Sequence, residues 1–248
     1  MTAKIAVLSD CHGNAAALDA VAKAIRTERP DAVFIAGDLI LNGPEPVATL
    51  DLVRELDAAG AKVVAGNTDI AVTDFDFAAA FPWMEEVPDS IREAAEWAHD
   101  QLSDDQIEWL RRLPIERRVR IDDTLFLGVH ASPGSQTKGF DKALDATVIL
   151  ERASGTDARV ICVGHTHVPE VRELGWKVIV NAGSAGYVFD GDPTASWALV
   201  TIDDAGELSA EIRRTPYDAL TVANAISARG LPGDVYRAAT VRTGKLVR

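Results

Sequence analysis

Four of the five histidines of this 248-residue chain stand in short motifs with aspartate, asparagine or glycine, or directly after an apolar run. The motifs are Asp10-Cys11-His12, Gly37-Asp38, Gly66-Asn67, the isolated His130, and Gly164-His165-Thr166-His167. The last motif places two imidazoles two residues apart on an extended or tightly turned segment, so the pair can reach two neighbouring metal ions. This concentration of potential ligands predicts a metal site.

The donor types limit which metals the site would hold. Imidazole, carboxylate and amide oxygens without a thiolate favour Mn, Fe, Co or Zn over a structural zinc site. Asp38 is the natural bridging ligand, because one carboxylate has two oxygens and can hold two ions. Two divalent ions, two carboxylates (Asp10 and Asp38) and one bridging hydroxide leave a local charge of about +1, which would attract a phosphate group.

Two ions roughly 3.5–4 Å apart would also lower the pKa of a bound water and clamp an in-line displacement at phosphorus. The ligand set therefore predicts hydrolysis of a phosphate ester. Two alternatives stay open. One is a non-catalytic metal-binding scaffold or interaction module on the same fold, and the other is a single metal that acts in redox chemistry.

Each motif follows an apolar run that is typical of a buried strand. The expected strands before the motifs cover 4–9, 32–36, 62–65, 125–129 and 159–163. Helices are expected over 15–29 and from Pro46 to about Gly60, where proline suits a first turn and glycine a C-terminus. This alternation predicts a parallel sheet, whose carboxyl edge is where ligands bind. Motifs far apart in the sequence are therefore expected to meet there.

The segment from about Ala71 to Pro114 departs from this pattern. Two helices are expected in it, near 90–102 and 104–113, with capping boxes at Ser90-x-x-Glu93 and Ser103-x-x-Gln106. The segment also holds Trp83, Trp97 and Trp109. It is either a lid over the site, in which case Trp83 or Trp97 would set substrate preference, or a helical layer with its own small core.

The remaining sequence predicts further strands at 117–121, 168–173, 177–180, 197–202 and 208–213. Helices are expected near 142–153 and 218–227, followed by a mixed tail from about Pro232. Neither an internal repeat nor a linker is evident. The expectation is one domain over residues 1–248, with a helical insertion at about 71–114.

The ordered motifs from Ser9 to His167 resemble the calcineurin-like metallophosphoesterase superfamily, above all its small single-domain bacterial and archaeal members. Asn181-Ala182-Gly183-Ser184 is similar to that group as well. The resemblance implies an α/β fold, a four-layer α/β/β/α sandwich, and a site for two divalent metal ions, with Mn²⁺ first and Fe, Zn, Co or Ni as alternatives. One ion would be held by Asp10, His12, Asp38 and His167, and the other by Asp38, Asn67, His130 and His165.

The resemblance also implies that Asp38, Asn67 and His130 act in catalysis, where a metal-bridging hydroxide attacks phosphorus. Two positions depart from the family pattern. Thr68 stands where many members carry a histidine that helps to protonate the leaving group, and Asn42 stands where protein phosphatases carry an arginine. Phosphodiester hydrolysis with some monoester hydrolysis is therefore expected, and protein phosphatase activity is not.

Four minor positions carry their own expectations. Asn14 and Asn67 are candidate substrate contacts, although Asn14 also suits a helix N-cap. Asp69 either orients a neighbouring ligand or satisfies backbone N–H groups in a turn. His99 is expected to be a surface or packing residue.

Composition limits the partners. A net charge of −13 argues against broad contact with nucleic acid, so the expected partner is a small phosphate ester. No run approaches the ~18 apolar residues of a membrane span, and the first residues lack a signal-peptide pattern. Two cysteines do not form a disulfide framework. A cytoplasmic location without membrane contact is expected, and self-association is left open.

Overall fold

The first sheet is built from parallel strands joined by helical crossovers. The computed structural model describes residues 2–248, in which β1 (Ala3–Leu8), β2 (Ala32–Ile35) and β3 (Lys62–Val63) are parallel neighbours. The antiparallel strands β9 (Ala195–Ile202) and β10 (Leu208–Thr215) extend the sheet to the order β10-β9-β1-β2-β3. Helices α1 (Ala15–Glu28) and α2 (Pro46–Ala58) make the crossovers. The β3 strand is only two residues long, shorter than expected.

The second sheet mixes parallel and antiparallel pairs. Its strands are β4 (Glu116–Ile121), β5 (Thr124–Val129), β6 (Val160–Val163), β7 (Glu170–Leu174) and β8 (Lys177–Asn181), in the order β4-β5-β6-β8-β7. Helix α7 (Ala146–Ala153) connects the parallel strands β5 and β6. It begins four residues later than expected, because Asp145 caps it by accepting a hydrogen bond from Thr147 N.

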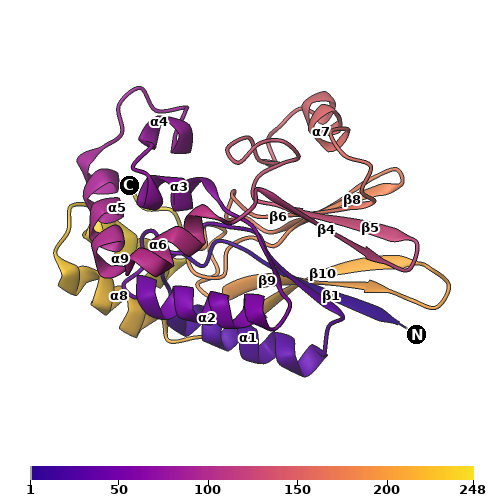
Figure 1. Ribbon diagram of the computed structural model, residues 1–248, viewed down its shortest axis with the longest axis horizontal. Helices are drawn as coiled ribbons and strands as arrows, with labels where there is room; N and C mark the ends of the chain where they lie inside the picture. Colours follow the sequence, from indigo (N-terminus) through magenta and orange to yellow (C-terminus); the bar gives the residue numbers. More distant parts are fainter. Residues whose placement is uncertain (1) are drawn as a thin grey trace.

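The two sheets stack face to face, and helices cover both outer faces (Figure 1). Along β1, Ile5 and Val7 face the core between the sheets with Phe34 and Phe126, whereas the alternate residues Ala6 and Leu8 face the helices α1 and α2. On the far side, Ile149 of α7 packs against the second sheet. The predicted four-layer α/β/β/α arrangement is confirmed.

The helical insertion contains four helices rather than two, and it begins at Asn67. They are α3 (Asn67–Thr73), α4 (Phe77–Ala80), α5 (Asp89–Gln101) and α6 (Asp104–Arg111). The capping box at Ser103 and Gln106 is confirmed. The box at Ser90 is wrong: α5 starts at Asp89, and the residue before it, Pro88, has no side chain able to cap. Residues of α3, α5 and α6 join α2 in the core of the first sheet, so the insertion does not form a separate core.

The last residues form a helical pair instead of a mixed tail. Helix α8 (Ala219–Arg229) is capped by Gly230, whose φ of 74° is left-handed, and α9 (Asp234–Thr243) follows after a short turn. The two helices pack against each other and against Tyr187. Figure 1 shows them in yellow beside the insertion. Within residues 2–248, no helix is both long and apolar enough to cross a bilayer.

Candidate metal centre

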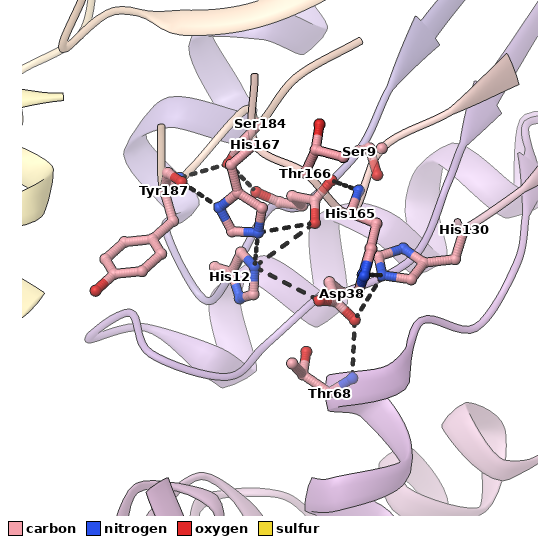
Figure 2. Close-up of polar contacts among 12 residues, drawn as sticks. Ser9, His12, Asp38, Thr68, His130, His165, Thr166, His167, Ser184 and Tyr187 are labelled. Atoms are coloured by element: carbon pink, nitrogen blue, oxygen red, sulfur yellow. Dashed lines mark hydrogen bonds and ion pairs between the residues drawn. The ribbon is translucent and has the colours of Figure 1, made fainter. Parts of the chain in front are cut away.

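All seven predicted metal ligands lie at one edge of the sandwich, just beyond the carboxyl ends of strands. The first sheet supplies Asp10 and His12 after β1, Asp38 after β2 and Asn67 after β3. The second sheet supplies His130 after β5, and His165 and His167 after β6. Figure 2 shows the side chains of five of them turned toward one another: His12, Asp38, His130, His165 and His167. The expectation that these distant turns converge is confirmed.

Four of these residues form the first donor cluster. The donor atoms of Asp10, His12, Asp38 and His167 all lie within 4.8 Å of one another, and all four residues are buried. His12 Nε2 lies 3.1 Å from His167 Nε2 and 3.7 Å from Asp38 Oδ2. His167 Nε2 lies 3.1 Å from Asp10 Oδ1. Nitrogen and carboxylate oxygen therefore surround one small volume.

The second donor cluster lies on the other side of Asp38. His130 Nε2 is 2.9 Å from Asn67 Oδ1 and 3.1 Å from His165 Nδ1. His165 Nδ1 is in turn 3.1 Å from Asn67 Oδ1. Asp38 Oδ1 lies 3.4 Å from His130 Nε2, while its other oxygen faces His12. One carboxylate thus joins both clusters.

Hydrogen bonds at the rear of the rings fix which nitrogen faces each cluster. His12 Nδ1 donates to Leu41 O over 2.8 Å, His130 Nδ1 donates to Ala36 O over 2.7 Å, and His167 Nδ1 donates to Tyr187 O. A carbonyl can only accept, so the neutral rings carry their proton on Nδ1 and point an Nε2 lone pair inward.

The inward-facing atoms fit a cation in each cluster. His12 Nε2 and His167 Nε2 lie 3.1 Å apart, and if both rings are neutral their lone pairs repel each other unless a positive charge, a proton or a metal ion, lies between them. Among the described residues, Asp10 Oδ1 is a buried side-chain oxygen that finds no hydrogen-bond partner. A buried carboxylate oxygen without a partner is costly, and a metal ion would satisfy it.

The ligand turns have an unusual backbone. Asp10, His12, Asp38, His165 and His167 all adopt left-handed conformations, with φ between 48° and 67°. Non-glycine residues avoid this region at a cost of about 1–3 kcal/mol each, and it persists where surrounding contacts enforce it. Five such residues at one edge indicate a functional site.

Glycine precedes a predicted ligand in three of the five motifs, at Gly37, Gly66 and Gly164, because the site leaves no space for a side chain there. A Cβ at Gly164 would lie 1.9 Å from Ser9 Oγ and 2.2 Å from Asp10 Oδ2. A Cβ at Gly66 would lie 2.1 Å from Asp38 Oδ1. The glycines therefore let the backbone of one motif pass directly against the carboxylate of another.

The electrostatics of the site follow from burial among opposite charges. Burial opposes ionisation of Asp10, but the neighbouring His167 and His12 hold its pKa well below the usual range. Burial also disfavours the charged forms of His12 and His130, yet the carboxylates of Asp10 and Asp38 raise the pKa of both rings. For His165, burial and then the adjacent His130 lower the pKa to about 4, so this ring is neutral at pH 7, as a metal ligand must be.

Asp69 supports the ligand turns from behind. Its carboxylate accepts hydrogen bonds from the backbone N–H groups of Asp38, Leu39 and Gly66, at 3.0, 2.8 and 2.8 Å. Burial, and next the charge of Asp38, raise the pKa of Asp69 to about 6. Asp69 satisfies backbone N–H groups in a turn, and these groups belong to the turns that carry the predicted ligands Asp38 and Asn67.

Asp69→Asn is expected to weaken metal binding by roughly 10- to 100-fold and to lower the free energy of unfolding by about 1–3 kcal/mol. The amide nitrogen of asparagine cannot accept a hydrogen bond, so at least one backbone N–H would lose its partner. Isothermal titration with Mn²⁺ and urea denaturation measure the two effects. Asp74→Asn is the matched control, because Asp74 lies at the end of the same helix in an exposed ion pair with Arg111. Equal metal affinity in the two variants would contradict the role given to Asp69.

Of three further positions singled out in the sequence, Asn14 and Thr68 lie at the edge of the site and His99 does not. Asn14 caps α1 through Oδ1, which accepts from Ala17 N, and its Nδ2 donates to Gly186 O. The N-cap role is confirmed, and a substrate contact by Asn14 stays a prediction. Thr68 donates its backbone N–H to Asp38 Oδ1 over 2.9 Å. His99 packs against Phe75, outside the site.

Two residues of the 181–184 segment hold the motifs together, a role that the sequence did not reveal. Asn181 Nδ2 donates to Gly164 O at 3.1 Å and to Thr166 Oγ1 at 2.8 Å. Ser184 Oγ donates to Asp10 O at 2.8 Å. In the sequence, residues 181–184 stand out only because they are similar to the family, and that similarity does not indicate these contacts.

A buried ionic cluster connects the C-terminal helices to His12. Asp234 pairs with Arg229 at 2.6 Å and with Arg237 at 3.1 Å. Arg229 donates to Gly43 O and Asn42 O, while Arg237 Nε donates to Asn42 Oδ1 at 3.1 Å. Asn42 Nδ2 lies 3.5 Å from His12 Nδ1. Asn42 thus stands at the position where protein phosphatases carry an arginine. Its side chain accepts a hydrogen bond from Arg237, which lies far away in the sequence.

The sheet order, the edge position and the paired donor clusters define a metallophosphoesterase-type centre. Residues 3–205 match the family model of the calcineurin-like phosphoesterase superfamily domain. The chain therefore belongs to the calcineurin-like phosphoesterase superfamily, in agreement with the resemblance noted in its motifs.

Particular relatives cover nearly all of the chain. It is similar to an uncharacterized protein of Methanocaldococcus jannaschii, with 26% identity over 229 residues, 86% of this chain and 88% of the other. A metallophosphoesterase from Sphaerobacter thermophilus shares 26% identity with a TM-score of 0.73, covering 98% of this chain and 99% of that one. A hypothetical protein from Pyrococcus horikoshii has a TM-score of 0.83 at 22% identity, with 98% of each chain covered, which shows a shared fold.

Proposed function

We propose that the protein is a hydrolase that uses two divalent metal ions, with Mn²⁺ first among the candidates, to cleave small phosphodiesters and, more slowly, monoesters. The observation that carries this proposal is the position of Asp38. Its Oδ2 lies 3.7 Å from His12 Nε2 and its Oδ1 lies 3.4 Å from His130 Nε2, so one carboxylate faces two donor clusters.

Each cluster supplies what a divalent ion requires. Asp10, His12 and His167 would complete one ion's ligands, and Asn67, His130 and His165 the other's. When bound, the ions would supply a water of lowered pKa as the nucleophile and would balance the charge on the phosphate. The Asn67 amide contributes an oxygen without adding negative charge, which keeps the site attractive to an anion.

The chain's own residues also limit the choice of leaving group. Thr68 stands where a histidine proton donor would be, and its backbone N–H is already bonded to Asp38. A leaving oxygen therefore has no evident general acid from the protein, so esters whose alcohols are stable as anions should react fastest, and an ordinary hydroxyl group must take its proton from water. The net charge of −13 supports a small substrate over a nucleic-acid strand.

Metal removal tests this function. Protein treated with a chelator is expected to lose all hydrolysis of bis(4-nitrophenyl) phosphate, and added Mn²⁺ should restore it, with titration ending near two ions per chain. Metal loading should also raise the melting temperature, because the ions bind the folded chain alone. Hydrolysis that survives chelation, or a single ion per chain at full activity, would contradict the proposal.

The second candidate is a metal-binding scaffold without activity, and the absence of a histidine at Thr68 is the feature that favours it. The same experiment separates the two functions. A scaffold would bind Mn²⁺ and gain thermal stability, but would hydrolyse neither diesters nor monoesters with any of the metals Mn²⁺, Fe²⁺, Co²⁺, Ni²⁺ and Zn²⁺.

A further inference from the structure

A pocket of about 320 Å³ lies directly beside the second donor cluster. It is lined by, among others, Trp83, Lys138, Gly139, Asp141, Arg152 and His165. Its volume falls at the lower end of the range for small-molecule sites, roughly 300–1,000 Å³. Because His165 belongs both to the pocket and to the donor cluster, a molecule held in the pocket would lie next to the reacting phosphate.

One wall of this pocket is an exposed tryptophan held in place from behind. The Trp83 side chain is 54% exposed, although an indole normally buries most of its surface. Its ring meets His165 edge-on at 6.1 Å and the buried Phe81 edge-on at 5.8 Å. These contacts fix the indole while leaving much of its surface free, which is the geometry needed to stack on a planar ring.

Trp97 serves as a useful contrast within the same insertion. It packs against the core of the first sheet and under the Arg229 guanidinium, 4.7 Å from the ring centre. In the sequence, Trp83 and Trp97 are equal candidates for setting substrate preference. In the structure they differ, and of the two only Trp83 is available to a ligand.

Another part of the pocket lining is a hydrogen-bonded loop that carries positive charge. Lys138 is exposed, but its backbone is fixed by Ser132 Oγ, which donates to Lys138 O at 2.6 Å, and by Ser135 Oγ, which accepts from Lys138 N at 3.0 Å. Arg152 donates to Gly139 O and holds the same loop. With one aspartate against two cations, the wall is net positive in a chain of net charge −13.

The loop also lies tightly against the metal-ligand ring. A Cβ at Gly139 would come within 2.9 Å of His165 Cδ2. This close approach keeps the positive wall and the donor cluster in fixed positions relative to each other, so the pocket can select a substrate of defined length.

We propose that this pocket binds the alcohol part of the substrate and selects one that joins a planar aromatic ring, stacked on Trp83, to a second anionic group, held by Lys138. Nucleotides have this chemistry. The inference rests on the proposed hydrolysis, in which water adds to phosphorus, the P–O bond to this alcohol breaks, and a proton from water ends on the departing oxygen. Trp83 and Lys138 are then specificity-determining residues.

Binding of three related ligands to the Mn²⁺-loaded protein tests the proposal without relying on turnover. Ribose 5-phosphate has one phosphate and no aromatic ring, AMP adds the ring, and adenosine 3′,5′-bisphosphate adds a second phosphate. Calorimetry should give a Kd that falls in that order. Base stacking on an aromatic side chain is expected to tighten AMP over ribose 5-phosphate roughly tenfold or more.

Two variants assign the preferences. Trp83→Ala should remove the advantage of AMP over ribose 5-phosphate, and Lys138→Gln should remove only the advantage of the bisphosphate over AMP. Trp176→Ala is the matched control, because Trp176 is also an exposed tryptophan (60%) and does not line the pocket. An unchanged affinity order in Trp83→Ala, or wild-type protein that binds ribose 5-phosphate as tightly as AMP, would overturn the proposal.

Turnover is measured separately, so that the two proposals can fail independently. If Trp83-dependent binding is found but no diester is hydrolysed, the pocket stands and the enzymatic function falls. If bis(4-nitrophenyl) phosphate is hydrolysed while the three ligands bind equally, the enzymatic function stands and the pocket assignment falls.

Discussion

Asp38→Asn is expected to eliminate metal-dependent phosphodiester hydrolysis, with a loss in kcat/KM of roughly a thousandfold or more. Asparagine keeps one oxygen but replaces the other with an NH₂ group, which cannot bind a cation. Since Asp38 directs one oxygen to each donor cluster, the shared ligand would be lost. Metal ions contribute several kcal/mol to such reactions, and ~4 kcal/mol corresponds to about a thousandfold.

The folded structure should tolerate this change, which makes the result interpretable. The asparagine Oδ1 can still accept the hydrogen bond from Thr68 N, and its NH₂ can face the inward lone pair of His12. Circular dichroism should therefore match that of the wild type in metal-free solution, while Mn²⁺ titration shows lost binding. Asp19→Asn, at an exposed ion pair with Lys23, is the control and should leave hydrolysis unaltered. Wild-type rates in Asp38→Asn would exclude a shared ligand.

The largest loss of stability is expected for Asp234→Ala, at roughly 3–5 kcal/mol, the usual effect of removing one partner from a buried ion pair. The Asp234 side chain is 4% exposed and those of Arg229 and Arg237 are 7% exposed. Without the carboxylate, two guanidinium groups would remain side by side in a buried position. Asp234 also accepts from Leu231 N at 3.1 Å, so the turn between α8 and α9 would lose a bond as well.

Urea denaturation followed by far-UV circular dichroism measures this loss. Asp19→Ala removes one partner of an exposed i,i+4 pair with Lys23 and should change stability by no more than about 0.5 kcal/mol. Because Arg237 also holds Asn42 beside His12, the midpoint of Mn²⁺ binding should move to higher concentration in Asp234→Ala. A destabilisation below 1 kcal/mol, comparable to that of the control, would show that the cluster is not a strong contributor.

The meeting of the ligand motifs at one edge of the sandwich could be predicted from the sequence, because it follows from local sequence patterns. Each ligand motif directly follows a short apolar strand, and the carboxyl ends of parallel strands lie on the same side of a sheet. The positions of Asp10, Asp38 and Asn67 at one edge needed only this rule. The pairing of His12 with His167 and of His130 with His165, implied by likeness to a family, matches the distances in the structure.

Helix α9, the ionic cluster and the pocket could not be predicted. The residues that form them lie far apart in the sequence, or polar residues among the buried ones hide the hydrophobic pattern. Helix α9 buries Asp234, Arg237 and Thr240 as well as apolar residues, so hydrophobic periodicity does not mark its inner face. The bond from Arg237 to Asn42 spans 195 residues. The pocket beside His165 similarly brings Trp83 of the insertion against Lys138 of a separate loop. Such contacts arise from tertiary packing, which short-range patterns do not encode.

The division of the donors between the two sheets has a mechanical consequence. In the first cluster His167 comes from one sheet and its three partners from the other, while in the second cluster His130 and His165 face Asp38 and Asn67 across the same seam. Each cluster therefore connects the two sheets of the sandwich. Sliding one layer against the other would pull both sets of donors apart at once, so cation occupancy and the alignment of the layers must rise and fall together.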